Sequence, residues 1–187
     1  MKPSRPSQRG VSLLESFLAL VMLSIGLLGV LGLQTAALVN SRASRSQINA
    51  RLAADDMAAR MQANPSIQAA MIYAGIRPGN SNPEPALNCA TAGRPCTPTQ
   101  MARFDAWEWQ NILSRRLPSG HGAVRCLERQ TDHELARCRR YAIAIAWIAD
   151  RPGDAAGPRP SEACAKTATT KTENDPSLDC LTVELQW

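Results

Sequence analysis

Residues 10–33 read GVSLLESFLALVMLSIGLLGVLGL, and this stretch decides the fold of the N-terminal part of the chain. The 23 residues from Val11 to Leu33 contain one charged residue, Glu15. An apolar segment of this length is long enough to cross a bilayer as a helix. A carboxylate inside such a segment costs about 2.5–3.5 kcal/mol. We therefore expect Glu15 to have a positively charged partner.

Residues 1–10 form a basic leader, in which Lys2, Arg5 and Arg9 are the charged residues. They favour a cytoplasmic N-terminus by the positive-inside rule. An ordinary secretory signal is cut after its apolar region, at small residues. Here the change in character lies before that region, between Gly10 and Val11. A plain signal anchor is the simplest alternative.

The sequence Gly10-Val11-Ser12-Leu13-Leu14-Glu15 resembles the class III signal of type IV prepilins. The resemblance implies that a membrane-bound prepilin peptidase cuts between Gly10 and Val11 and that the new amine of Val11 is methylated. It also implies that Glu15 attracts the N-terminal amine of a neighbouring subunit during docking. Pairing these charges offsets much of the cost of burying them in lipid. Ser12 and Glu15 also fit a capping box, and both roles are compatible.

A single long helix is predicted from Val11 to Asn64, because Pro65 is the first proline after the leader. Residues 11–33 are its transmembrane or filament-core half, and residues 34–64 its amphipathic half. One apolar face of that second half is expected to pack under a sheet and contains Val39, Ala43, Ala50, Ala53, Ala54, Met57 and Met61. Ile48, Leu52 and Ala59 form a second strip, which is either the edge of the same core or a contact for neighbouring subunits.

Residues 25–34 and 56–65 resemble the PilV-type minor pilins, also called type IV pilus modification proteins. This resemblance implies a single-pass inner-membrane protein with a cytoplasmic N-terminus and a periplasmic C-terminal domain, which then enters a pilus at the cell surface. It also implies a low-abundance subunit near the pilus tip. Its partners would be the prepilin peptidase, other minor pilins, the major pilin, the inner-membrane assembly platform and a tip adhesin.

All six cysteines follow the predicted helix, namely Cys89, Cys96, Cys126, Cys138, Cys164 and Cys180. An even number in an exported domain predicts disulfides. The simplest of the 15 connectivities is sequential, Cys89–Cys96, Cys126–Cys138 and Cys164–Cys180. A zinc site can be drawn from Cys126, His133 and Cys138, but its spacing fits no common pattern, and we expect no metal.

Residues 65–187 are predicted to form one periplasmic globular domain. We expect an irregular excursion over residues 65–103 and a short helix whose apolar residues run from Ala102 to Leu117. Alternation of side chains predicts strands near 122–128, 139–150 and 180–187, with a disulfide-pinned loop between the last two. An antiparallel sheet of these strands would cover the amphipathic half of the long helix. The predicted fold is a stalked, pilin-like α+β fold with disulfide-stabilised loops.

The formal charge of +5 falls to +2 without the leader, since the rest of the chain has 18 basic and 16 acidic residues. No basic stripe interleaved with aromatic residues is present, so we expect no nucleic-acid partner. No catalytic constellation or phosphate-binding loop stands out, and we expect neither an enzyme nor a cofactor. Two alternatives to a pilus subunit near the tip stay open. One is a minor pseudopilin of a type II secretion system, and the other is a tip module whose loops at 65–103 and 151–179 bind a surface.

Overall fold

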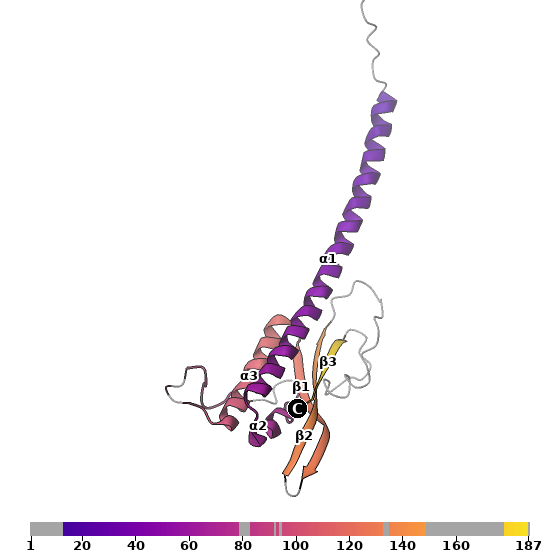
Figure 1. Ribbon diagram of the computed structural model, residues 1–187. Helices are drawn as coiled ribbons and strands as arrows, with labels where there is room; N and C mark the ends of the chain where they lie inside the picture. Colours follow the sequence, from indigo (N-terminus) through magenta and orange to yellow (C-terminus); the bar gives the residue numbers. More distant parts are fainter. Residues whose placement is uncertain are drawn as a thin grey trace, which may run out of the picture. The chain divides into compact units, whose positions relative to one another are not determined.

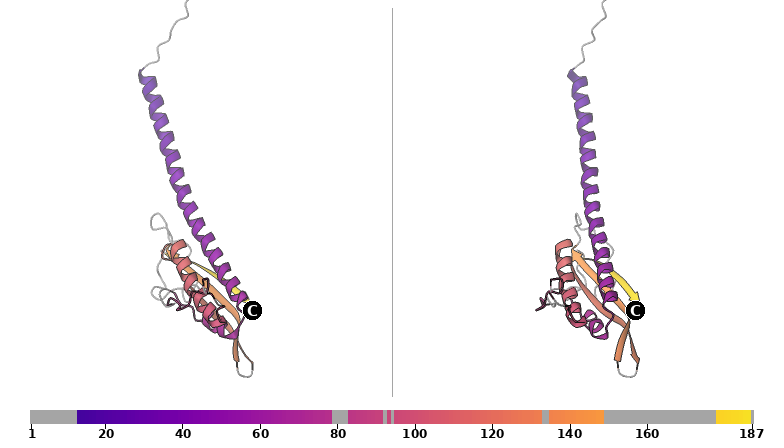
Figure 2. Two further views of the ribbon diagram at one scale, coloured as in Figure 1. Left: turned by 90° about the vertical axis from the view of Figure 1, so that its left-hand side faces the viewer. Right: turned by 60° about the vertical axis from the view of Figure 1, so that its left-hand side comes forward.

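The computed structural model describes residues 13–78, 83–91, 93, 95–132, 135–148 and 178–186. In chain order the elements are α1 (Leu13–Ala63), α2 (Ile67–Tyr73), α3 (Pro98–Arg116), β1 (His121–Asp132), β2 (Leu135–Ile148) and β3 (Leu178–Gln186). Figure 1 and Figure 2 show them in three views. The chain divides into two compact units, the first ending at Ser41 and the second beginning at Arg42. The predicted α+β architecture, a long N-terminal helix with a small antiparallel sheet, is confirmed.

Helix α1 runs without interruption for 51 residues and ends two residues before Pro65. Its buried side in the second unit consists of Ala50, Ala53, Ala54, Met57, Ala58 and Met61. The predicted core face is wrong at its N-terminal end, since Val39 is only partly buried and Ala43 is exposed. The reason is that the buried cluster formed with the other elements includes no α1 residue before Ala50.

The second apolar strip of α1 lies outside the core. Ile48 is 58% exposed and Leu52 is 54% exposed, and Ala59 is exposed as well. Of the two interpretations left open by the sequence, the edge of the core is therefore wrong. The strip is an apolar surface of the isolated chain.

The sheet has the order β1-β2-β3, and both pairs of neighbours are antiparallel. Tyr141, Ile143 and Ile145 of β2 lie opposite Leu185, Val183 and Leu181 of β3. These residues and Val124 of β1 belong to or pack against one buried cluster with α1, α2 and α3. The large residues of β2 thus share the core face, as the alternation predicted. The small residues Ala144 and Ala146 form a separate buried cluster with Cys180.

Strands β1 and β2 are longer than predicted toward the turn that joins them. Strand β1 continues to Asp132 instead of ending near residue 128, and β2 begins at Leu135 instead of 139. Two register irregularities occur on either side of Glu128. They interrupt the simple alternation of side chains that the prediction relied on, because a bulge shifts the residues that follow it. Residues 149 and 150 of the predicted second strand lie outside the described residues.

The predicted irregular excursion over residues 65–103 is wrong at both ends. Helix α2 begins after Ser66, whose side chain accepts a hydrogen bond of 3.1 Å from the Ala69 amide. Helix α3 begins at Pro98, four residues before the predicted Ala102. Thr97 and Gln100 form a capping box there. The side-chain oxygen of each residue accepts a hydrogen bond from the backbone N–H of the other. Both helices begin where they do because the capping side chains accept hydrogen bonds from backbone N–H groups of the first helical turn.

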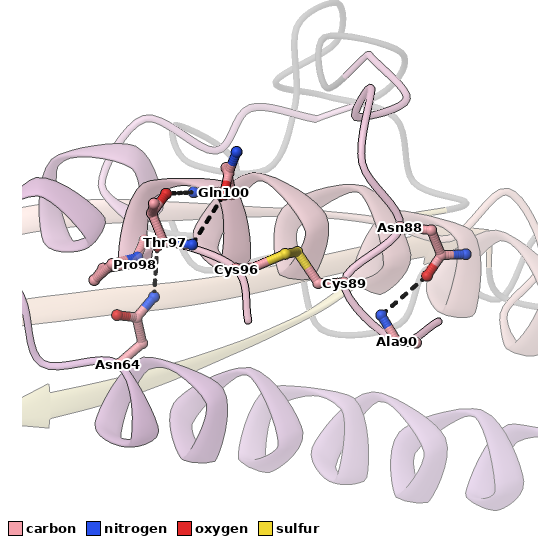
Figure 3. Close-up of a disulfide and its surroundings, with 8 residues drawn as sticks. All are labelled: Asn64, Asn88, Cys89, Ala90, Cys96, Thr97, Pro98 and Gln100. Carbon is pink, nitrogen blue, oxygen red and sulfur yellow. Dashed lines mark hydrogen bonds between the residues drawn. A yellow bond between two sulfur atoms is a disulfide. The ribbon is translucent and has the colours of Figure 1, made fainter. Parts of the chain in front are cut away.

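Two disulfides join described residues, Cys89–Cys96 and Cys126–Cys138, which are the first two pairs of the sequential connectivity. Figure 3 shows that Cys96 directly precedes the capping box of α3. The other bond links β1 to β2. Cys180 is disulfide-bonded as well. Its predicted partner Cys164 lies outside the described residues.

Candidate functional site

The apolar half of α1, described from residue 13 to 33, is exposed along its whole length in the isolated chain. Exposed fractions reach 90% at Leu13, 63% at Phe17 and 75% at Met22. By length and composition α1 is a helix able to cross a membrane, and no part of its most apolar stretch is buried. An exposed apolar surface of this extent requires lipid or protein to cover it. The helix fits a membrane-anchored protein.

Glu15 lies in the first turn of α1 as the structure describes it. A carboxylate at this position is favoured by the positive end of the helix dipole. Within the described part of the chain, Glu15 makes no hydrogen bond or ion pair with another residue. The predicted cleavage residues Gly10 and Val11 lie outside that part, so the predicted pairing of Glu15 with an amine stays a prediction.

Two hydroxyl groups in or near the apolar segment are satisfied within the helix. Ser24 Oγ donates to the Leu20 carbonyl oxygen over 2.8 Å, and Thr35 Oγ1 donates to the Gly32 carbonyl oxygen over 2.8 Å. Polar groups in a bilayer must find partners internally, because no water is available there. Glu15 differs from both hydroxyls, because no hydrogen bond or ion pair within the described residues satisfies its carboxylate.

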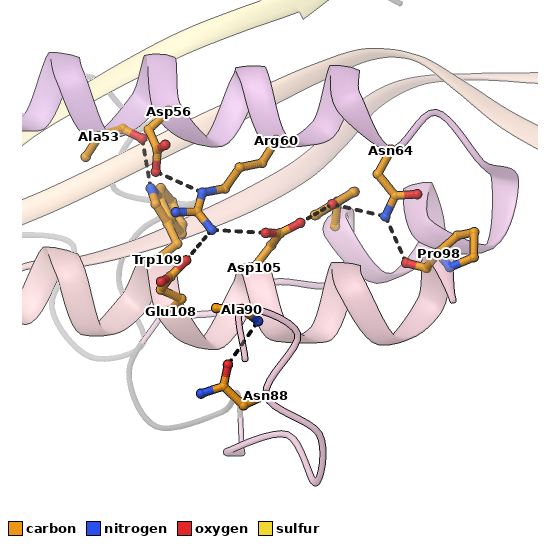
Figure 4. A network of polar contacts seen from close by, with 11 residues as sticks. Ala53, Asp56, Arg60, Asn64, Asn88, Ala90, Pro98, Asp105, Glu108 and Trp109 are labelled. Carbon is orange, nitrogen blue, oxygen red and sulfur yellow. Dashed lines mark hydrogen bonds and ion pairs between the residues drawn. The ribbon is translucent and has the colours of Figure 1, made fainter. Parts of the chain in front are cut away.

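In the second unit a polar cluster connects α1, α2 and α3. It consists of Asp56, Arg60, Asn64, Tyr73, Asp105 and Glu108. Figure 4 shows Asp56 and Arg60 of α1, and Asn64 directly after its end, on the side that faces α3. Their spacing of four residues places Asp56 and Arg60 one above the other on the helix surface, and Asn64 continues this row at the helix end.

Arg60 is the centre of the polar cluster. Its Nε lies 3.0 Å from Asp56 Oδ2, and its Nη1 lies 3.0 Å from Asp105 Oδ1. The same Nη1 also pairs with the Glu108 carboxylate. Burial by itself lowers the pKa of Arg60, but hydrogen bonds and charge from the three carboxylates raise it overall. The guanidinium is thus held charged between two helices.

Asp105 is the buried acid of the polar cluster, with 5% of its surface exposed. Besides the bond from Arg60, it accepts a hydrogen bond of 2.6 Å from the Tyr73 hydroxyl. Burial of Tyr73 and its bond to Asp105 raise the pKa of the phenol. Asn64 Nδ2 donates to the Pro98 carbonyl oxygen over 2.8 Å. Each buried polar side chain of the cluster therefore has a partner, as interior polar groups require.

The polar cluster holds α1, α2 and α3 together through ion pairs and hydrogen bonds. Trp109 reinforces it, because its Nε1 donates to the Ala53 carbonyl oxygen over 2.8 Å. Within the described residues no group of three His, Cys, Asp or Glu side chains is placed to hold a metal ion. His133 of the drawn zinc site lies outside those residues.

The sequence interpretation missed the polar cluster. The signal lies in residues 56–65, the segment that resembles the PilV-type minor pilins, where Asp56, Arg60 and Asn64 recur at intervals of four residues. Asp55, the neighbour of Asp56 in the sequence, takes no part in the polar cluster and pairs with Arg51 over 3.3 Å on the exposed side of α1.

Residues 32–107 match the Tt1218-like family, described as type IV pilin Tt1218. The match covers the second half of α1, α2 and the first half of α3, with five of the six residues of the polar cluster. No curated protein and no solved structure matches the chain significantly. The match supports a type IV pilin, and it does not single out the PilV-type branch.

Proposed function

We propose that this chain is a minor type IV pilin of the PilV type that helps to start pilus assembly and to present tip components. The family match over residues 32–107 supports the pilin part of the proposal. The observation that carries the rest is Glu15, a single acid in the first turn of an exposed apolar helix. The PilV-type assignment rests on the resemblance of residues 25–34 and 56–65.

The proposed processing begins in the inner membrane. A prepilin peptidase cuts between Gly10 and Val11 from the cytoplasmic side, and the amine of Val11 is then methylated. The C-terminal domain lies in the periplasm, where its cysteines can oxidise. In support, the chain has a basic leader directly before a helix that is long enough to span a bilayer.

In the proposed docking step, the Glu15 carboxylate attracts the α-amine of an adjacent subunit. The attraction is strong in hydrocarbon because the dielectric constant is low. It also disfavours a register in which the two charges do not meet. The partners in this step are other minor pilins and the major pilin at the inner-membrane assembly platform. The chain itself is proposed to carry no enzymatic activity.

Intact mass and N-terminal sequencing of the chain from its native membrane test the proposed processing. We expect a mature chain that begins at Val11, and a Gly10→Glu variant that keeps its leader. A Gln8→Ala variant changes the leader without changing the junction and serves as the matched control. A Gly10→Glu chain of normal mature mass would contradict the proposal.

Assembly is tested with Glu15→Gln, which removes the charge and keeps the shape. We expect this variant to reach the membrane but to enter sheared pili at a level reduced by more than tenfold, as quantified by immunoblot. Ser16→Ala, at the neighbouring position, should enter at the wild-type level. Deletion of the gene should reduce surface pili. If the deletion instead blocks enzyme secretion, the chain is a pseudopilin of a type II system.

A further inference from the structure

A cavity of about 360 Å³ lies in the second unit between α2 and the β1–β2 hairpin. The α2 wall is formed by Ile67, Ala70 and Met71, together with Ala74 directly after the helix. Figure 1 shows α2 beside this hairpin, and Ala70 and Ala74 also border the buried core. The volume falls within the range that small-molecule sites occupy. The apolar wall favours an apolar ligand.

The opposite wall is rigid. Cys126 and Cys138 contribute to it and are joined by the disulfide between β1 and β2. Tyr141, which is 1% exposed, forms part of the same wall. Met71 is 70% exposed, and its flexible thioether can adapt to different shapes. The disulfide wall is fixed and Met71 opposite it is adaptable, so the cavity suits a flat or branched apolar group.

The described charged residues that line the cavity are both basic. Among the residues that the structure describes, Arg77 and Arg129 line it, and no carboxylate does. Arg129 is exposed on β1 and makes no ion pair with any residue that the structure describes. A guanidinium presents a planar set of donors that matches a carboxylate. The lining therefore complements a ligand with an apolar body and a negative head.

We propose that this cavity binds an apolar molecule that carries one carboxylate. Either a free aromatic acid or the C-terminal residue of a peptide with an apolar side chain supplies this chemistry. The apolar body lies between α2 and the disulfide, and the carboxylate faces Arg129 and Arg77. This inference does not depend on the proposed role in pilus assembly.

The test uses the full chain in lipid nanodiscs and ¹⁹F NMR of 4-(trifluoromethyl)phenylacetate. We expect saturable binding with a Kd of about 1 mM or tighter, the affinity of a small fragment. The corresponding amide, 4-(trifluoromethyl)phenylacetamide, should bind about tenfold more weakly because it lacks the charge. Empty nanodiscs correct for partitioning into lipid. Equal affinity for acid and amide would overturn the proposal.

Variants locate the binding. Arg129→Gln should weaken binding of the acid about tenfold and leave the affinity for the amide unchanged. Arg125→Gln removes the same charge from an exposed position of the same strand that does not line the cavity, and it should bind like wild type. Equal effects of the two substitutions would show long-range charge attraction instead of a site, and would also overturn the proposal.

A second comparison separates the two sources of the carboxylate. The probes are the peptides Gly-Ser-Gly-Phe with a free C-terminus and with a C-terminal amide, used as competitors of the fluorinated acid. Competition by the free acid peptide alone supports a peptide C-terminus as ligand. Competition by neither peptide supports a free aromatic acid, provided that the fluorinated acid itself binds. Competition by both peptides to the same extent contradicts the role of the carboxylate.

Discussion

Arg60 on α1 and Asp105 on α3 lie 45 residues apart in the chain, and their side chains are joined by an ion pair of 3.0 Å between Nη1 and Oδ1. Asp105 is almost fully buried, whereas Arg60 is partly exposed. The pair connects the helix that carries the apolar segment to a helix of the globular part. The stability of the second unit should therefore depend on it.

Replacing Arg60 by Met should lower the free energy of unfolding by about 2–4 kcal/mol. The variant leaves the buried Asp105 without its cation, which is costlier than the loss of an exposed pair. Arg51→Met removes an Arg from the same helix that also pairs with an Asp four residues away, and it should cost at most about 1 kcal/mol. Chemical denaturation of both variants checks the difference. Equal losses would show that the polar cluster adds nothing beyond a surface pair.

Stability should also fall in alkaline solution. Burial raises the pKa of both tyrosines, Tyr73 and Tyr141, and the bond to Asp105 raises that of Tyr73 further. The folded state thus holds these protons more tightly than the unfolded state. The protonated tyrosines therefore contribute their full stabilisation below the ordinary pKa of about 10. This contribution is lost as the pH rises through the pKa values of the folded state.

This pH dependence can be measured by thermal melts between about pH 8 and 11 and by the tyrosinate absorbance of the folded chain. We expect the melting temperature to decline above about pH 10 and no ionisation of tyrosine before unfolding. In Tyr73→Phe the decline should be shallower. Ionisation of both tyrosines near their ordinary pKa in the folded chain would contradict this account.

Gly122 lies against Trp109 in the core. A Cβ at this position would overlap the indole ring, with 2.6 Å to Cζ3, and would lie 2.8 Å from Leu113 Cδ1. Trp109 and Leu113 are fully buried, and side chains in a close-packed core shift only at a cost in free energy. Gly122→Ala should therefore destabilise the fold by about 1–3 kcal/mol. Gly93→Ala, where a Cβ would meet nothing within 4 Å, should change the stability little, as measured by denaturation.

The exposed strip on α1 predicts a contact in the assembled state. Ile48→Ser combined with Leu52→Ser should leave the melting temperature within a few degrees of wild type, because both side chains are more than half exposed. Incorporation into sheared pili should fall several-fold. Met71→Ser removes an exposed apolar side chain from α2 and should not affect incorporation. A double variant that assembles as well as wild type would exclude the strip as a subunit contact.

The helix and the strands were predictable where one periodicity continues over many residues. Proline-free sequence up to Asn64 predicted α1, and alternation predicted the core face of β2. The core face of α1 was overextended to Ala43, because the sequence does not reveal where the other elements stop covering the helix. Helix α2 is short, and its seven residues contain too few turns for a periodic signal. The start of α3 could have been predicted from the sequence, because Thr97 and Gln100 have the spacing of a capping box.

The sequence by itself determined the exposed apolar segment with its lone Glu15, the order of helix and strands, and the pattern that turns Tyr141, Ile143 and Ile145 inward. These features depend on local periodicity and composition, which each segment carries alone. Only the tertiary structure decided that Arg60 meets Asp105 and Glu108, that Gly122 lies under Trp109, and that a cavity opens beside the Cys126–Cys138 disulfide. Contacts between distant residues depend on the path of the whole chain, and no local pattern encodes that path.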